Sequence, residues 1–191
     1  MPDRLARVLA AIDAANAADP HLAPDGQPQA LLYGRRMPDN LARFAPQASE
    51  ALQIAARGQH IERWTIPRAS YPEGRTAYLI WRKDLQKHHA ERCGAIMAAE
   101  GYGADEIARV GALLRKERLK QDPDVQTLED VICLVFLAHE ADAFIAKHDD
   151  AKVRDILAKT ARKMSPAGLA AAGALSLPPR LARLLGEALA S

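Results

Sequence analysis

Two histidines stand at positions where a helical register would let them bind a metal ion or act as a base. His60 lies near the end of a predicted helix, just before an arginine-containing loop. His89 shares a predicted helix face with Leu85 and Cys93, which favours an inward orientation, while the adjacent His88 points about 100° away. The alternatives are that His60 only caps its helix end as a cation and that the histidine pair lies on a solvated face.

Two acids enter the most apolar stretch of the chain, which spans residues 131–137. Glu129 and Asp130 each lie one helical turn before apolar side chains of that stretch. A buried carboxyl group must be paired, protonated or bound to a metal ion, so both acids are candidate metal ligands. Alternatively, Thr127–Asp130 matches a capping pattern and Asp130 marks a late helix start, although Asp122-Pro123 makes a better start.

Arginine side chains gather before and after His60, although the net charge of the chain is only +2. The fork of N–H donors on a guanidinium matches phosphate and carboxylate groups, which predicts an anionic, phosphorylated small molecule as the ligand. The alternative is a set of internal ion pairs with nearby acids such as Glu50 and Glu62. The candidate substrate-binding arginines are Arg35, Arg36, Arg63, Arg68, Arg75 and Arg82.

The elements that would position these side chains are all helical, and no strand pattern is visible. Pro67, Pro72 and Gly74 interrupt the helices in a loop that is either functional or a solvated excursion. We therefore expect an all-α fold, a single domain over residues 1–191 with about seven to nine helices. The expected helices are 5–18, 29–44 (bent or interrupted near Pro38), 47–64, 77–100, 105–119, 123–148, 151–163 and one or two more after Ser165.

The composition excludes several classes of protein. Of the 191 residues, 49% are apolar and 26% are charged, which is typical of a globular protein and not of a disordered one. Alanine makes up about a fifth of the chain, which favours helix. No apolar run is long enough to span a membrane, and the balanced charges give no signal for nucleic acid or for an anionic membrane surface.

Two cysteines, Cys93 and Cys133, lie in apolar stretches without CxxC or zinc-ligand spacing. We expect both to be buried, reduced thiols. The first residues carry charges, Arg4 and Arg7 among them, in place of the apolar core of a secretory signal, so we expect cytoplasmic localisation. The sequence leaves the oligomeric state open.

The chain resembles, over nearly its whole length, the family catalogued as domain of unknown function 4202. Some members of that family are labelled glutamyl-tRNA synthetase, but this chain has no nucleotide-binding signature of a synthetase, so we discount the label. The family brings no established activity with it. The segments that carry the resemblance are Leu31–Met37, Ala48–Glu50, Gln59–Trp64, Tyr78–Arg82, His89-Ala90, Gln126–Asp130 and Lys159–Ser165.

A more distant similarity is to the HD-domain metal-dependent phosphohydrolases, which are all-α proteins. Their divalent ion is held by a histidine on one helix, a His-Asp pair at the end of the next and an aspartate on a later helix. The order of residues here is similar, which implies an HD-like fold. It also implies one divalent metal ion whose ligands are His60, His89 and either Glu129 or Asp130.

The chain departs from the HD pattern in three places. Gln59-His60 stands where the His-Asp pair would be, and Lys116 stands where a further histidine often falls. The preceding helix supplies Tyr33 and two arginines in place of a histidine, so Tyr33 joins the substrate-binding candidates. The candidate catalytic residues are Gln59, Glu62 and Lys116.

Three functions are open on these grounds. Our leading hypothesis is a metal-dependent phosphohydrolase in which the ion lowers the pKa of a bound water and the arginines hold the phosphate of a nucleotide-like substrate. The second is a non-catalytic module that binds an anion or a nucleotide, which the missing His-Asp pair favours. The third is an interaction protein whose polar side chains form internal ion pairs.

Overall fold

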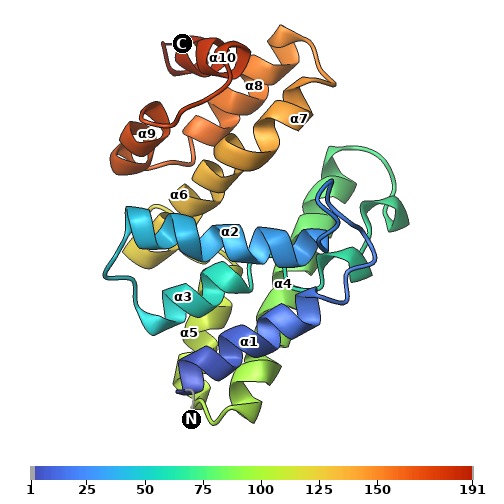
Figure 1. Cartoon of the computed structure of the whole chain (residues 1–191), viewed down its shortest axis with the longest axis vertical. Coiled ribbons are helices and arrows are strands. Elements are labelled where there is room, and N and C mark those ends of the chain that lie inside the picture. The colour runs from blue at the N-terminus through green and yellow to red at the C-terminus, as the bar shows by residue number, and fades with distance from the viewer. Residues whose placement is uncertain (1–2, 191) are drawn as a thin grey trace. The chain divides into compact units, whose positions relative to one another are not determined.

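A computed structural model describes residues 3–190, and every regular element in that range is helical (Figure 1). Extended pairing in these residues is limited to an isolated bridge between Leu22 and Pro28, so the all-α prediction is confirmed. The ten α-helices described slightly exceed the expected number, because the helix predicted over 123–148 is interrupted. Their bounds are α1 Arg4–Asn16, α2 Gln29–Phe44, α3 Glu50–Arg57, α4 Arg75–Ala99, α5 Ala104–Leu114, α6 Pro123–Val135, α7 Ala141–Ile145, α8 Asp150–Ala161, α9 Pro166–Gly173 and α10 Pro179–Ala190.

The chain divides into two compact units, Met1–Arg118 and Leu119–Ser191, which we call the N-terminal and C-terminal units. Each is described by itself below, and the single domain expected over residues 1–191 stays a prediction. Between residues 3 and 190, every helix is either too short or too polar to traverse a lipid bilayer.

The N-terminal unit is a bundle in which α4 lies along α5, and α3 contacts α1, α2 and α5 (Figure 1). Side-chain caps set two of its helix starts: Asp3 accepts a hydrogen bond from the backbone N–H of Ala6, and Ser49 accepts one from Leu52. Apolar side chains from all five helices are buried between them, as the helical spacing of these residues predicts. The largest include Ile12, Met37, Leu41, Leu52, Ile54, Leu85, Met97, Leu113 and Leu114.

The third helix ends at Arg57, seven residues before the expected end at Trp64. Gly58 follows the helix, and a Cβ atom there would collide with the Sγ atom of Cys93 on α4. Only glycine therefore allows the end of α3 and the middle of α4 to approach so closely. As a result, His60 does not continue the polar face of α3 but lies in the turn that follows it.

The segment between α3 and α4 is held against α4 rather than projecting into solvent. Two short 3₁₀ turns, Arg63–Thr65 and Arg68–Ser70, replace an irregular loop. The indole Nε1–H of Trp81 donates to the carbonyl of Ile66 at 2.9 Å, and the Tyr71 hydroxyl donates to Asp84 at 2.7 Å. These contacts fix the direction in which this segment presents its side chains.

The C-terminal unit begins with the most apolar helix. Asp122 caps α6 by accepting hydrogen bonds from the backbone N–H groups of Asp124 and Val125 at 3.0 and 3.3 Å, as its sequence predicts. A π-helical turn, Phe136–Glu140, then separates α6 from α7, which corrects the expectation of one continuous helix to His148. Helices α9 and α10 begin at prolines, and α9 is capped by Ser165.

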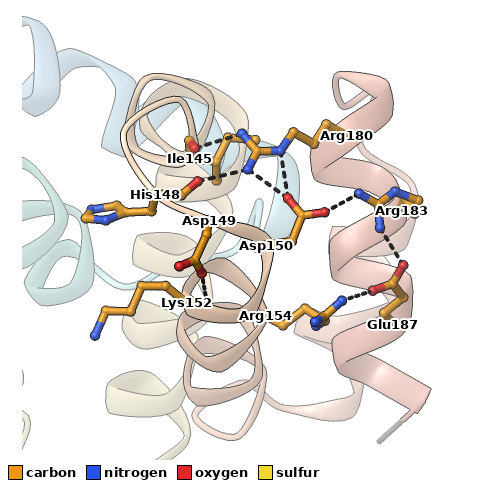
Figure 2. Close-up of polar contacts among 9 residues, drawn as sticks. All are labelled: Ile145, His148, Asp149, Asp150, Lys152, Arg154, Arg180, Arg183 and Glu187. Carbon is orange, nitrogen blue, oxygen red and sulfur yellow. Dashed lines mark hydrogen bonds and ion pairs between the residues drawn. The ribbon is translucent and has the colours of Figure 1, made fainter.

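Arg180 of α10 ties this helix to the turn between α7 and α8 (Figure 2). Its guanidinium donates to the backbone carbonyls of Ile145 and His148 at 2.9 Å, and to the carboxylate of Asp150 at 2.8 and 3.0 Å. Arg183 donates to the second oxygen of Asp150 at 2.6 Å, and the two arginines together lower the pKa of that acid. The carbonyls at the end of α7 thus find partners outside their own helix.

Candidate functional site

The candidate site in the N-terminal unit is built around a contact between His60 and Tyr33. Tyr33 is a buried residue of α2, and its ring stacks on the imidazole of His60 with centroids 3.9 Å apart and planes 18° apart. The short α3 makes this stack possible, because the turn after Arg57 carries His60 toward α2. Two residues that the sequence left on separate helices are therefore in direct contact.

His89 of α4 lies beside this pair and faces inward, as its helical register predicts. Its centroid is 6.1 Å from that of His60, and only 3% of its surface is exposed. Its Nδ1 atom is 2.8 Å from the backbone carbonyl oxygen of Ile61, whereas its Nε2 atom is buried without a hydrogen-bond partner among residues 3–190. Burial and, to a lesser extent, the charges of Arg63 and Arg82 lower the pKa of His89 to about 3, so its imidazole is neutral near pH 7.

Three cations from three segments act on His60, and two of them, Arg63 and Arg82, also act on His89. Arg63 follows His60 in the chain, and its guanidinium lies 4.7 Å from the ring centroid of Trp81. Arg82 of α4 donates a hydrogen bond to the hydroxyl of Tyr78 at 3.3 Å. Lys116 follows α5 in a left-handed backbone conformation, with φ of 56°.

We call Tyr33, His60, Arg63, Arg82, His89 and Lys116 the His60 cluster. Burial holds the pKa of His60 well below its usual range, and the nearby positive charges of Arg63, Arg82 and Lys116 lower it further. Neutral imidazoles next to fixed cations form an electropositive site that also contains a hydrogen-bond acceptor. Such a site is chemically suited to bind an oxyanion.

The other two catalytic candidates are close in sequence but have different surroundings. Gln59 is buried, and its Oε1 atom has no partner within the described part of the chain. Glu62 accepts two hydrogen bonds from Arg92, at 2.5 and 2.9 Å, and its carboxylate lies 3.8 Å from Nε2 of His88. The carboxylate of Glu62 thus forms an ion pair with Arg92. Internal ion pairs of the acids near His60 were the alternative to a ligand site.

The other four candidate arginines have surroundings that differ from those of Arg63 and Arg82. Arg35 donates to the side chain of Gln27 at 3.3 Å, and Arg68 donates to the carbonyl of Tyr71 at 2.9 Å. Arg75 is exposed at the first residue of α4. Arg36 is partly buried on α2, and its carbonyl accepts a hydrogen bond from the Asn40 side chain at 2.9 Å.

The two candidate acids lie in the C-terminal unit, buried in α6. Asp130 accepts hydrogen bonds from the backbone N–H and the hydroxyl of Ser165, at 2.8 and 2.5 Å, and from Gln126 at 3.2 Å. Glu129 lies 3.8 Å from the ammonium group of Lys163. Because α6 starts at Pro123, the alternative in which Asp130 caps a late helix is wrong, and Asp130 instead anchors the start of α9.

The residues present fit an anion better than a divalent metal ion. Across residues 3–190, no three His, Cys, Asp or Glu side chains come together in a way that could hold a metal. The charges with the largest effect on His60 are positive, and they oppose a cation at the same place. The orphaned Nε2 of His89 is the one feature here that would suit a metal ligand.

Sequence reasoning missed two aromatic residues and one backbone atom that organise the cluster. Trp81 and Tyr78 hold Arg63 and Arg82, and the carbonyl of Ile61 orients His89. Trp81 and Arg82 follow Tyr78 by three and four residues on one helix, and this spacing was a signal that could have linked each of them to Tyr78. The role of a backbone carbonyl, by contrast, has no signature in the sequence.

A pocket of about 300 Å³ also opens between α3 and α5, and its lining contains none of the predicted site residues. Its acidic wall is neutralised, because Arg4 pairs with Glu106 at 2.6 Å and lies 3.4 Å from Glu50. The hydroxyl of Tyr102 donates a hydrogen bond to the carboxylate of Glu50. Burial together with this hydrogen bond raises the pKa of Tyr102. We therefore regard the His60 cluster as the candidate functional site.

Both cysteines are buried and are not joined in a disulfide, as their apolar surroundings predict. Burial raises the pKa of Cys93 to about 12, which leaves this thiol unreactive at neutral pH.

Comparison with known proteins identifies a family but no activity. None of the curated proteins and none of the solved structures that were compared matches the chain, so the HD-like resemblance stays an expectation. Residues 6–185 match the family described as domain of unknown function (DUF4202), in agreement with the resemblance seen in the sequence. That match covers nearly all of the sequence, and the chain therefore belongs to the DUF4202 family.

Proposed function

We propose that the protein binds a small, phosphate-bearing anion at the His60 cluster of its N-terminal unit. The observation that carries this proposal is that the charges of Arg63, Arg82 and Lys116, from three separate segments, all act on the partly buried His60. Positive charges gathered around a poorly solvated position create a positive potential there, which attracts an anion. A bound oxyanion would supply the counter-charge.

The two arginines are well prepared for this role. The contact of Arg63 with Trp81 and the hydrogen bond of Arg82 to Tyr78 restrict both side chains before any ligand arrives. Less conformational entropy is then lost on binding, and the planar guanidinium groups match the oxygens of a phosphate. The neutral state of His60 and His89 adds polar groups without further positive charge.

The metal-dependent phosphohydrolase is the second candidate. The observation in its favour is His89, whose Nδ1 bonds a backbone carbonyl while Nε2 has no partner in the described residues, an arrangement common among metal-binding histidines. In this candidate, His60 and His89 would be two of the ligands of the divalent ion, and an acid would be the third. A bound ion of this kind makes a nucleophile from water at neutral pH. The three cations and the existing partners of Asp130 count against this candidate.

Titration calorimetry with inorganic phosphate and adenosine monophosphate tests the binding proposal. We expect Arg63→Ala and Arg82→Ala each to weaken binding about tenfold or more, the size of one lost charge-assisted hydrogen bond. Arg43→Ala is the matched control. It removes the same positive charge, but from an exposed arginine of α2. Binding that is equally strong in all three variants would contradict the proposal.

Elemental analysis of untagged protein separates the two candidates. About one equivalent of a transition metal that is lost in His60→Ala would support the phosphohydrolase, as would phosphatase activity that a chelator abolishes. Phosphate binding that needs no metal and is followed by no turnover supports the binding module. An interaction protein would show neither, and Arg63→Ala would then change its stability alone.

The proposed partner is a small molecule and not a nucleic acid or a membrane surface, because the cationic groups are few and clustered. A reducing, cytoplasmic compartment is part of the same proposal. It agrees with the two buried cysteines, which are not joined in a disulfide.

A further inference from the structure

We propose that Nε2 of His89 accepts a hydrogen bond from the bound ligand, so that the site prefers an oxyanion carrying its own proton over a fully deprotonated one of similar shape and charge. This inference rests on the proposed function, since it specifies which class of anion the His60 cluster takes. The ligand class is inorganic phosphate or a phosphate monoester that keeps a hydroxyl on phosphorus, and sulfate is the excluded counterpart.

The tautomer of His89 follows from its one hydrogen bond. Nδ1 lies 2.8 Å from the carbonyl oxygen of Ile61, and a carbonyl oxygen can only accept. Nδ1 therefore carries the proton and donates it. A neutral imidazole has a single N–H, so Nε2 is left with a lone pair and can act only as an acceptor.

Nε2 is buried, and it has no partner within residues 3–190. Buried polar atoms are almost always hydrogen-bonded, because an unsatisfied one retains the cost of losing water. The two ring nitrogens lie on different edges of the imidazole, so Nε2 points away from Ile61. The ring centroid lies 6.1 Å from that of His60, so this acceptor belongs to the His60 cluster.

The site thus offers two complementary kinds of group. The guanidinium and ammonium groups donate to the oxygens of an anion, whereas Nε2 needs a donor. The low pKa of His89 keeps the ring neutral and its lone pair available in the physiological range. Hydrogenphosphate can satisfy both kinds of group at once, because one of its oxygens carries a proton. Sulfate has no proton at neutral pH, and one of its oxygens would meet the lone pair of Nε2.

A comparison of phosphate with sulfate on the unmodified protein tests the inference directly. At mildly alkaline pH both are tetrahedral dianions, so their charge and shape are matched. We expect titration calorimetry to show about a tenfold or larger preference for phosphate, the size of one buried hydrogen bond. Equal affinities would overturn the inference and leave the proposed function standing, whereas no binding of either anion would overturn both.

Substitution of the histidine locates the acceptor. In His89→Asn the amide N–H can still donate to Ile61, but the Nε2 acceptor is lost. We expect this variant to bind phosphate and sulfate with equal affinity, with sulfate binding close to that of the unmodified protein. His88→Asn is the matched control and should keep the preference, because His88 faces Glu62 and Thr65. A preference that survives in His89→Asn would overturn the inference.

A spectroscopic measurement keeps the inference testable if His89→Asn fails to fold. Nitrogen-15 NMR of the six histidines should show a shift of the His89 Nε2 resonance on addition of phosphate and a much smaller one with sulfate. An unchanged Nε2 resonance at saturating phosphate would overturn the inference.

Methyl phosphate distinguishes a free phosphate from an ester as the natural ligand. An alkyl phosphate keeps a hydroxyl on phosphorus only below its second pKa, about 6. Binding of methyl phosphate under mildly acidic conditions as tight as that of inorganic phosphate would assign a phosphate monoester. Loss of binding on methylation would assign free phosphate.

Discussion

Tyr33 and His60 stack with their ring centroids 3.9 Å apart, and this contact joins the middle of α2 to the turn after α3. The stack covers one face of the imidazole and thereby contributes to its desolvation. Because His60 is the residue on which three cations act, the position of α2 helps to determine the electrostatics of the candidate site.

Replacement of Tyr33 by alanine should destabilise the protein by about 3 kcal/mol, since it removes a buried aromatic ring and leaves a cavity. Tyr33→Phe keeps the ring and the stack and should cost less. Urea denaturation of both variants measures the difference in unfolding free energy. Equal stability of the alanine and phenylalanine variants would show that the stack contributes nothing.

Acid should destabilise the protein through its two inner histidines. The pKa of His89 is about 3 in the folded protein against 6.5 for an ordinary histidine, and that of His60 is also lowered. The unfolded chain therefore binds more protons than the folded one in this range. The stabilisation is complete above about pH 6.5 and is lost as the pH falls toward 3, with a slope of up to about 1.4 kcal/mol per pH unit for each histidine.

Carboxylates also titrate at the lower end of this range, so a variant is needed to isolate the histidine effect. His89→Asn removes one titrating group and keeps a donor for the Ile61 carbonyl. Its unfolding free energy, measured in buffers without phosphate, should fall less steeply between pH 6.5 and pH 5 than that of the unmodified protein. Identical slopes would mean that His89 is not a neutral buried group.

The close approach of α3 to α4 should require that position 58 carries no side chain. Gly58→Ala places a Cβ atom against Sγ of Cys93 and should lower the free energy of unfolding by about 1–3 kcal/mol. Cys93→Ala removes the obstructing atom, so the double variant should recover part of that loss. A double-mutant cycle with additive effects would refute the steric explanation.

Asp130 of α6 should prove to have a structural role. Asp130→Ala removes the acceptor for both the N–H and the hydroxyl of Ser165, and we expect a loss of about 2 kcal/mol. Ser165→Ala should cost about 1 kcal/mol through loss of the α9 cap, and the two effects should couple in the double variant. Removal of the exposed Glu91 carboxylate should change stability little and serves as the control. A stable Asp130→Ala variant would reopen a role for this acid as a metal ligand.

Local signals along the chain were sufficient to predict most of the helices. Asp122-Pro123 and Ser165-Pro166 predict helix starts that the structure confirms, because capping and the fixed φ of proline act within one turn. The range 29–44 is also confirmed, with Pro38 inside a continuous helix. The inward orientation of His89 followed from the 3.6-residue period alone.

Contacts between distant residues decided the rest. The early end of α3 depends on Cys93, which is far from Gly58 in the sequence, and the partner of Asp130 is 35 residues away. The acceptor on His89 exists because the carbonyl of Ile61 takes the proton of Nδ1, and a backbone carbonyl has no residue-specific pattern. Arg63, Arg82 and Lys116 come from three segments. Their joint effect on His60 depends on how these segments pack, and no local pattern of the sequence encodes that packing.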